Sequence, residues 1–301
     1  DLIGSARDKG AVFATITRLD GAFGLKRDNL QHPVQGGLAG LAKTAALEWE
    51  NVCCHALDIA PEWRDNRAIA SAVVKEVMST GPIEIGLDLN SRCTPSLRSA
   101  PLPEGSIHLN QIDVVVVSGG ARGVTAAAAV ELARHSGCRM VLLGRSPQPA
   151  AEPGWLSALE NEADIKKAIL AHEYHGQNAT LPEIEKSYRS YMANREIAAN
   201  LKRLEAIGTH FSYYSADIRD YEATRSIINE IRQTMGPISA VIHGAGVLED
   251  RLITDKTIDQ FRRVYDTKVK GLNNLLRATQ QDSLKFLVLF SSVAARMGNK
   301  G

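Results

Sequence analysis

Runs of apolar residues alternate with amphipathic segments through the second half of the chain. Residues 113–118 (DVVVVS) form an apolar run of the kind that is typical of a parallel strand buried on both faces. A glycine-rich turn follows, and residues 126–135 then read as a helix. Further strands are predicted over 140–143, 210–214, 240–243 and 286–290, and further helices over 221–234 and 259–279. This alternation predicts an α/β fold with a doubly wound parallel sheet.

The first hundred residues show a shorter version of the same alternation. Strands are predicted over 11–17, 53–59 and 84–89, and helices over 34–49 and 67–79. The segment 94–106 carries three prolines and a glycine among polar residues, which indicates a linker. We therefore expect two Rossmann-like subdomains, residues 1–105 and residues 106–301.

Residues 147–207 interrupt the alternation of the second subdomain. The segment is charged and helix-prone, and it contains Tyr188 and Tyr191 at a spacing that suits the half-buried face of a helix. We interpret it as a helical insertion after the second strand, bordering the substrate entrance or a docking surface.

Composition and charge narrow the class of protein. Apolar residues make up 44% of the chain, and the formal net charge is +1, which argues against a nucleic-acid-binding or membrane-surface protein. No stretch approaches the roughly 18 apolar residues of a membrane span. The four cysteines show no CxxC spacing, which favours free thiols in a reducing cytosol and a cytoplasmic location. The chain starts at Asp1 without an initiator Met, so we expect a piece of a longer polypeptide.

The glycine-rich turn is the first candidate binding site. It directly follows a predicted strand and opens a helix, where backbone N–H groups can hold a pyrophosphate. An ordinary tight turn is the alternative. Thr125 stands where many such motifs carry a third glycine. The residues that we expect to touch the cofactor here are Gly119, Gly120, Ala121, Arg122, Gly123 and Val124.

The end of the second strand indicates which dinucleotide binds. NAD sites usually place an acidic residue there for the ribose 2′-hydroxyl, but this chain has Arg145 and Ser146. Both can bind a 2′-phosphate, and Arg122 in the glycine turn adds a second cation. Each cation alone could be a solvated surface charge. Together they favour NADPH over NADH.

Two further strand ends complete the expected cofactor site. Asp217 and Ile218 follow the third strand, where the carboxylate can bind the adenine edge or, alternatively, cap a helix. Gly244, Ala245 and Gly246 follow the fourth strand, and such small residues let the backbone approach a ribose. His243 before them is more typical of a residue packed against the sheet than of a catalyst.

Two residues could carry chemistry at this edge of the sheet. Ser292, preceded by Ser291, ends the fifth strand, where its hydroxyl can bind a substrate carbonyl. Lys268 in the preceding helix can hold the nicotinamide ribose or lower the pKa of a neighbouring acid, although an exposed helix charge is the alternative. His172 and His175 lack the further ligands of a metal site, so we expect no metal.

The motifs SGGARGVT, LLGRS, ADIRD, HGAGVLEDRLI, DTKVKGLNNL and VLFSSVAARMG occur in the order of a known family. They resemble the ketoreductase domain of polyketide and polyunsaturated fatty acid synthases, a branch of the short-chain dehydrogenase/reductase superfamily. The resemblance implies that residues 1–105 form a truncated, structural Rossmann subdomain and that residues 106–301 bind NADPH. It also implies reduction of a β-ketoacyl thioester on an acyl carrier protein, beside neighbouring synthase domains. Ser292 and Lys268 match the catalytic Ser and Lys, and Ser291 a cofactor neighbour.

Two other functions remain open at this point. A non-catalytic domain could keep the fold and the NADPH pocket for the architecture of a synthase, although the intact Lys268 and Ser292 favour an enzyme. A free-standing short-chain reductase is disfavoured by a first half without a nucleotide-binding motif.

The resemblance also implies a catalytic Tyr, with an Asn four residues after it, beyond Gly301. No Tyr follows Ser292 in the chain. We therefore predict that the 301-residue chain binds NADPH without reducing a β-ketoacyl thioester, and that a chain extended through that segment turns over. Loss of NADPH absorbance measures both rates. Reduction at full rate by the 301-residue form would show that the Tyr assignment is wrong.

Overall fold

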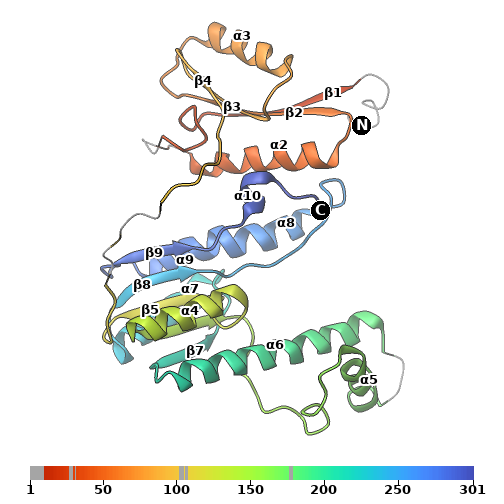
Figure 1. Cartoon of the computed structure of the whole chain (residues 1–301), viewed down its shortest axis with the longest axis vertical. Helices are drawn as coiled ribbons and strands as arrows, with labels where there is room; N and C mark the ends of the chain where they lie inside the picture. Colours follow the sequence, from red (N-terminus) through yellow and green to blue (C-terminus); the bar gives the residue numbers. More distant parts are fainter. Residues whose placement is uncertain (1–9, 27–29, 31, 102–104, 106–107, 176–178) are drawn as a thin grey trace. The chain divides into compact units, whose positions relative to one another are not determined.

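The computed structural model describes residues 10–26, 30, 32–101, 105, 108–175 and 179–301. Contacts divide the chain into two compact units (Figure 1). The first comprises Asp1–Glu104, Glu249–Ile258 and Ser291–Gly301, and the second comprises Gly105–Leu248 and Asp259–Phe290. The units separate inside the expected linker, of which residues 102–104 and 106 lie outside the described residues. Two later segments group with the first unit, which the sequence did not indicate.

The second unit is built on a parallel sheet of five strands in the order β7-β6-β5-β8-β9. Its first strand lies in the middle, and the chain winds outward first to one side and then to the other. This order confirms the predicted doubly wound fold. The strands are β5 (Val114–Ser118), β6 (Arg139–Gly144), β7 (Phe211–Ser215), β8 (Ile238–His243) and β9 (Phe286–Leu289).

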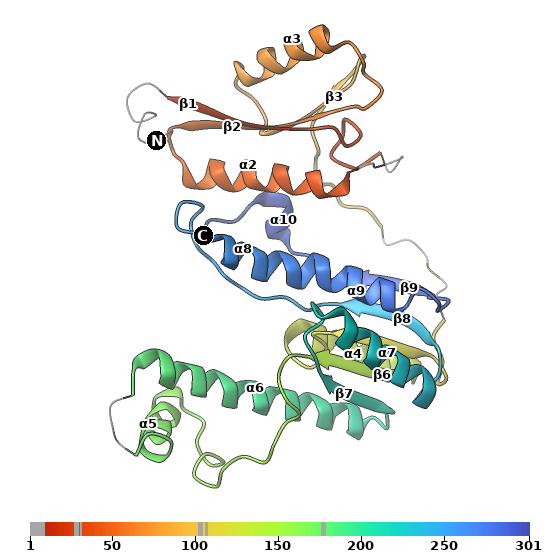
Figure 2. The same cartoon turned by 180° about the vertical axis from the view of Figure 1, so that it is seen from behind.

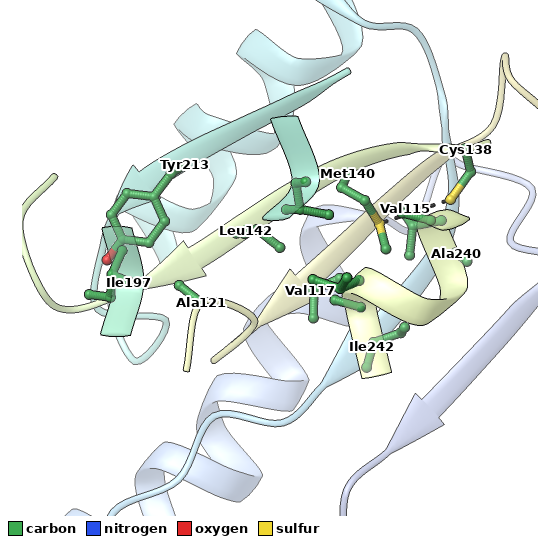
Figure 3. Packing of buried hydrophobic residues seen from close by; sticks show 14 residues of the cluster. Val115, Val117, Ala121, Cys138, Met140, Leu142, Ile197, Tyr213, Ala240 and Ile242 are labelled. Atoms are coloured by element: carbon green, nitrogen blue, oxygen red, sulfur yellow. Dashed lines mark hydrogen bonds between the residues drawn. The ribbon is translucent and has the colours of Figure 1, made fainter. Parts of the chain in front are cut away.

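Helices cover both faces of this sheet, which explains the apolar run of β5. Val115 and Val117 face a cluster with α4 (Gly123–Ser136), which is drawn in Figure 3. Val114 and Val116 face the opposite cluster with α7 (Tyr221–Thr234) and α9 (Gly271–Ala278). Figure 2 shows these two helices. All four valines are fully buried.

The helix predicted over 259–279 is interrupted. It consists of α8 (Ile258–Tyr265), a π-helical segment (Asp266–Lys270) and α9. Widened turns of this kind occur frequently at functional sites. The sequence shows the same helical periodicity on both sides of the break and gives no sign of the break itself. The prediction of one continuous helix was therefore wrong.

The insertion consists of two helices, α5 (Glu162–His172) and α6 (Leu181–Ala206). A capping box of Thr180 and Glu183 starts α6. Near its beginning, α6 packs on α5 around a cluster that includes Tyr188 and Tyr191. Farther along, α6 leaves this hairpin and packs against the α4 side of the sheet.

The first unit has a smaller sheet in the order β1-β2-β3-β4. The first three strands are parallel, and β4 is antiparallel to β3. The strands are β1 (Ala11–Thr17), β2 (Val52–Ile59), β3 (Glu84–Leu87) and β4 (Arg92–Cys93), and the helices are α2 (Gly37–Glu48) and α3 (Asn66–Val77). The two residues of β4 were not predicted, because so short a strand leaves no periodicity.

A buried carboxylate organises the loop that follows β1. Asp58 accepts hydrogen bonds from the Thr17 hydroxyl at 2.7 Å and from the backbone N–H groups of Leu19, Asp20 and Phe23 at 2.8, 3.3 and 2.9 Å. Burial acts to raise the pKa of Asp58, but these hydrogen bonds outweigh it and hold that pKa below its usual value. The loop after β1 is therefore held by a carboxylate of the neighbouring strand β2.

We predict that Asp58→Asn lowers the free energy of unfolding by about 2 kcal/mol. The amide loses the negative charge that accepts these hydrogen bonds, and its NH₂ group faces backbone N–H groups of the loop, which are donors as well. Urea unfolding followed by tryptophan fluorescence measures the change. Glu62→Gln is the control, because Glu62 is exposed in the same unit. Equal stability of the Asp58→Asn variant and the wild type would contradict this role.

Candidate cofactor and catalytic site

The glycine turn joins β5 to α4 in a space that excludes side chains. Gly119 has a φ of +71°, and a Cβ on it would lie 2.8 Å from the backbone of Ala245. A Cβ on Gly120 would lie 2.6 Å from Val117. Both distances are below van der Waals contact. The turn can therefore approach residue 245 after β8 only because residue 119 is a glycine, and it can pack on Val117 only because residue 120 is a glycine.

Gly244 explains how the site accommodates Thr125. A Cβ on Gly244 would lie 2.3 Å from Oγ1 of Thr125, which is buried. The β-branched side chain therefore fills the room that Gly244 leaves. Gly246 has a similar function towards Lys268, whose Cε would lie 3.0 Å from a Cβ at residue 246.

A cleft of about 430 Å³ lies at this edge of the sheet, where the strand order reverses. Open α/β sheets bind their ligands at such switch points. All the predicted cofactor residues except Gly120 and Ser291 line it. Gly120 is buried beneath the turn, and Ser291 belongs to the first unit. The lining residues among those predicted are Gly119, Ala121, Arg122, Gly123, Val124, Arg145, Ser146, Asp217, Ile218, Gly244, Ala245 and Gly246.

The two candidate cations of the cleft differ in their partners. Arg145 is exposed, and within the described residues its guanidinium makes no hydrogen bond or ion pair. Arg122 instead forms an ion pair with Glu196 of α6, with 3.2 Å between Nε and Oε2. No sequence pattern indicated Glu196, because it lies 74 positions from Arg122 in an insertion whose placement local patterns cannot reveal.

Asp217 lines the cleft with both carboxylate oxygens engaged. The Arg219 guanidinium donates to them at 3.0 and 2.6 Å and holds the pKa of Asp217 below its usual value. The cap of α7 is Asp220, which accepts from Ala223 N–H, so Asp217 does not cap that helix.

His243 links β5 to the π-helical segment. Its Nε2 lies 2.9 Å from the carbonyl oxygen of Lys268, and its Nδ1 lies 2.7 Å from the Ser118 hydroxyl. A carbonyl only accepts, so the partners assign the proton to Nε2 and make Nδ1 the acceptor. Burial lowers the pKa of His243, which fits this neutral form. His243 therefore holds the backbone of Lys268 and is packed in the sheet, as expected.

Lys268 is half-buried, which argues against the alternative of an exposed helix charge. Its Nζ donates to the carbonyl oxygen of Phe290 at the end of β9, 3.1 Å away. Burial lowers the pKa of Lys268. Lys270 in the same π-helical segment is exposed, as expected for a solvated surface charge.

Ser292 begins a short helix of the first unit, α10 (Val293–Met297). Its Oγ accepts a hydrogen bond from Ala294 N–H at 3.1 Å, which leaves the hydroxyl proton available for another acceptor. The buried Lys43 fixes the far end of α10 by donating to the Arg296 carbonyl at 2.7 Å. Glu84 binds the Lys43 ammonium at 3.1 Å and the Arg296 guanidinium at 2.7 Å. The first unit thus holds the segment that carries Ser292.

The described residues form neither a metal-ligand cluster nor a membrane-spanning helix. In the described part of the chain no group of three or more His, Cys, Asp or Glu residues could hold a metal ion. His172 instead stacks on Trp155, with 4.9 Å between ring centroids. None of the described helices is long and apolar enough to cross a membrane.

We predict that His243 makes the stability of the protein depend on pH. A lowered pKa means that the folded state binds fewer protons than the unfolded state, so stability falls as the pH drops below about 6.5. Between pH 7.5 and pH 5.5, wild type should lose about 1 kcal/mol more unfolding free energy than His243→Gln, which cannot titrate there. Urea unfolding of both proteins at pH 7.5 and pH 5.5 measures this difference in unfolding free energy. Replacement of the exposed His135 by Gln should leave the wild-type dependence intact, and parallel curves for His243→Gln and wild type would refute the prediction.

The sequence has relatives among multidomain synthases. The profile of the KR domain matches residues 114–301. The chain is 36% identical to a polyunsaturated fatty acid synthase polypeptide of Thraustochytrium sp., over 96% of this chain and 11% of that protein. It is 33% identical to the polyketide synthase PksN of Bacillus subtilis, over 36% of this chain and 2% of that protein. The chain thus spans 11% or less of the length of these relatives.

Solved ketoreductase structures share the fold. A ketoreductase domain from the bacillaene assembly line has a TM-score of 0.67 at 21% identity, over 99% of this chain and 58% of that one. A-type ketoreductases from a modular polyketide synthase have a TM-score of 0.66 at 22% identity, over 96% of this chain and 52% of that one.

Proposed function

Because this chain belongs to the KR domain family of ketoreductases, we propose that it reduces a β-ketoacyl thioester to a β-hydroxyacyl thioester. The substrate is carried on an acyl carrier protein, and the chain acts as one domain of a polyketide or polyunsaturated fatty acid synthase. The observation that carries the proposal is the half-buried Lys268, tied to the end of β9 and packed against Gly246 of the cleft. An ammonium held there can act on a group bound in the cleft.

The residues of the cleft fit NADPH as the cofactor. The glycine turn offers a backbone that a pyrophosphate can approach, and the exposed Arg145 offers a cation for a 2′-phosphate beside the Ser146 hydroxyl. Ala245 and Gly246 leave room for a ribose, and Asp217, already bound by Arg219, borders the adenine end. When bound, NADPH supplies a hydride for the ketone carbon of the substrate.

The protein's own groups act on the substrate oxygen. Ser292 donates a hydrogen bond from its hydroxyl to the ketone oxygen, where negative charge develops during reduction. By the family resemblance, Lys268 orients the nicotinamide ribose and Ser291 is a cofactor neighbour. A tyrosine beyond Ser292, which the resemblance also implies, gives the oxyanion its proton.

The two parts of the chain have different tasks in this proposal. Residues 1–105 form the structural subdomain, in which Lys43 and Glu84 hold the Ser292 segment, and residues 106–301 form the catalytic one. The substrate's carrier protein and the neighbouring synthase domains are the expected partners. The half-buried Lys268, whose pKa is lowered by burial, favours an enzyme over a purely architectural domain.

We predict that Arg145→Ala weakens the binding of NADPH by about tenfold or more, because one charge-assisted contact to the 2′-phosphate is lost. Binding of NADH, which lacks that phosphate, should change less than twofold. Isothermal titration calorimetry of the 301-residue chain measures both dissociation constants. Arg134→Ala removes a cation from the exposed surface of α4 and is the matched control. If NADPH and NADH binding were weakened by the same factor, the assignment of Arg145 to the 2′-phosphate would be contradicted.

A further inference from the structure

Helix α6 of the insertion binds the glycine turn at three consecutive residues. The Asn200 amide donates to the carbonyl oxygen of Ala121 at 3.0 Å. The Glu196 carboxylate accepts from Nε of Arg122 at 3.2 Å and from the backbone N–H of Gly123 at 2.7 Å. The insertion therefore contacts the part of the cleft where a pyrophosphate is expected.

This contact is anchored in the core of the second unit. Ile197 and Leu204 of α6 are each 1% exposed and belong to the same cluster as Ala121, which Figure 3 shows beside Ile197. Asn200, one helical turn from Glu196, is also buried. The buried face of α6 fixes the helix against the turn, and Glu196 lies at the edge of that face.

Glu196 lies where an anion is favoured. Gly123 is the first residue of α4, so its N–H has no partner within the helix and lies at the positive end of the helix dipole. A phosphate of a bound dinucleotide uses such an N–H group. In this structure the N–H is already bound to a carboxylate of the same chain, and Glu196 also borders the cleft.

We propose that Glu196 is an internal competitor for the pyrophosphate position, so that a dinucleotide binds only after displacing its carboxylate. The inference rests on the proposed function, because it takes the cleft as a dinucleotide site. The ion pair with Arg122 is open to solvent, with side-chain exposures of 52% for Arg122 and 43% for Glu196. Such pairs are weak, so the carboxylate can leave when a phosphate replaces it. The insertion thereby sets the affinity of the domain for its cofactor.

The neutral variant Glu196→Gln tests the competition. It keeps the shape of the side chain but removes the charge that opposes a phosphate, so NADPH should bind about tenfold more tightly. NADH should also bind more tightly, because both dinucleotides share the pyrophosphate, and NADPH should gain at least as much, because the substitution also releases Arg122 for the 2′-phosphate. Calorimetric titration of the 301-residue chain at fixed salt measures both, with Glu205→Gln as the control for an exposed acid on the same helix. An unchanged or weaker affinity, or a gain confined to NADPH, would overturn the inference.

Thermal unfolding separates competition from a merely structural clamp. If Glu196 competes, Glu196→Gln should lower the Tm of the free chain and enlarge the rise in Tm that saturating NADPH produces. A structural clamp would lower the Tm with and without NADPH and leave that rise unchanged or smaller, which would refute competition.

The outcomes distinguish this inference from the proposed function. If neither wild type nor Glu196→Gln binds a nicotinamide dinucleotide, the proposed function fails, and the inference fails with it. If wild type binds NADPH and Glu196→Gln binds it no better, the inference alone fails. If only Glu196→Gln binds detectably, competition by Glu196 is supported in its strongest form.

Discussion

The candidate site depends on close backbone packing between the ends of strands β5 and β8. With its left-handed backbone, Gly119 brings the turn after β5 so close to Ala245 that a Cβ would lie 2.8 Å from that residue's backbone. A Cβ on Gly244 would likewise lie only 2.3 Å from Oγ1 of Thr125. Because these positions carry no side chains, the ends of β5 and β8 can adjoin and leave an open cleft at the switch point of the sheet. A methyl group at either glycine would push apart the elements that form the cleft.

Polar contacts then set the positions of the chemical groups around that space. Ser118 and His243 connect the central strands to the backbone of Lys268, and Phe290 binds its ammonium at the end of β9. In the first unit, Lys43 binds the carbonyl groups at the end of α10. A buried ammonium that binds carbonyl oxygens at a helix terminus also interacts favourably with the helix dipole. The candidate lysine and the segment of the candidate serine are thus each held by partly buried hydrogen bonds.

The sequence predicted the parts of this fold that depend on local signals. Strand β5 is buried on both faces and therefore reads as an unbroken apolar run, and α7 has the predicted bounds because its periodicity is strong and Asp220 caps it. The π-helical break at Asp266–Lys270 and the two-residue strand β4 leave no local pattern, so both were missed. The contact of Glu196 with the glycine turn depends on where a long insertion folds back. Motif spacing could therefore suggest the candidate cofactor residues but not the acid that we propose as a competitor.

A crystal structure of the 301-residue chain with NADP⁺ would show whether the glycine turn is a dinucleotide cradle whose anion position Glu196 holds until the dinucleotide binds. We expect a pyrophosphate oxygen within hydrogen-bond distance of the Gly123 N–H, the 2′-phosphate against Arg145, and the Glu196 carboxylate displaced from the turn. A dinucleotide bound while Glu196 still accepts from Gly123 N–H, or bound away from the turn, would contradict this expectation.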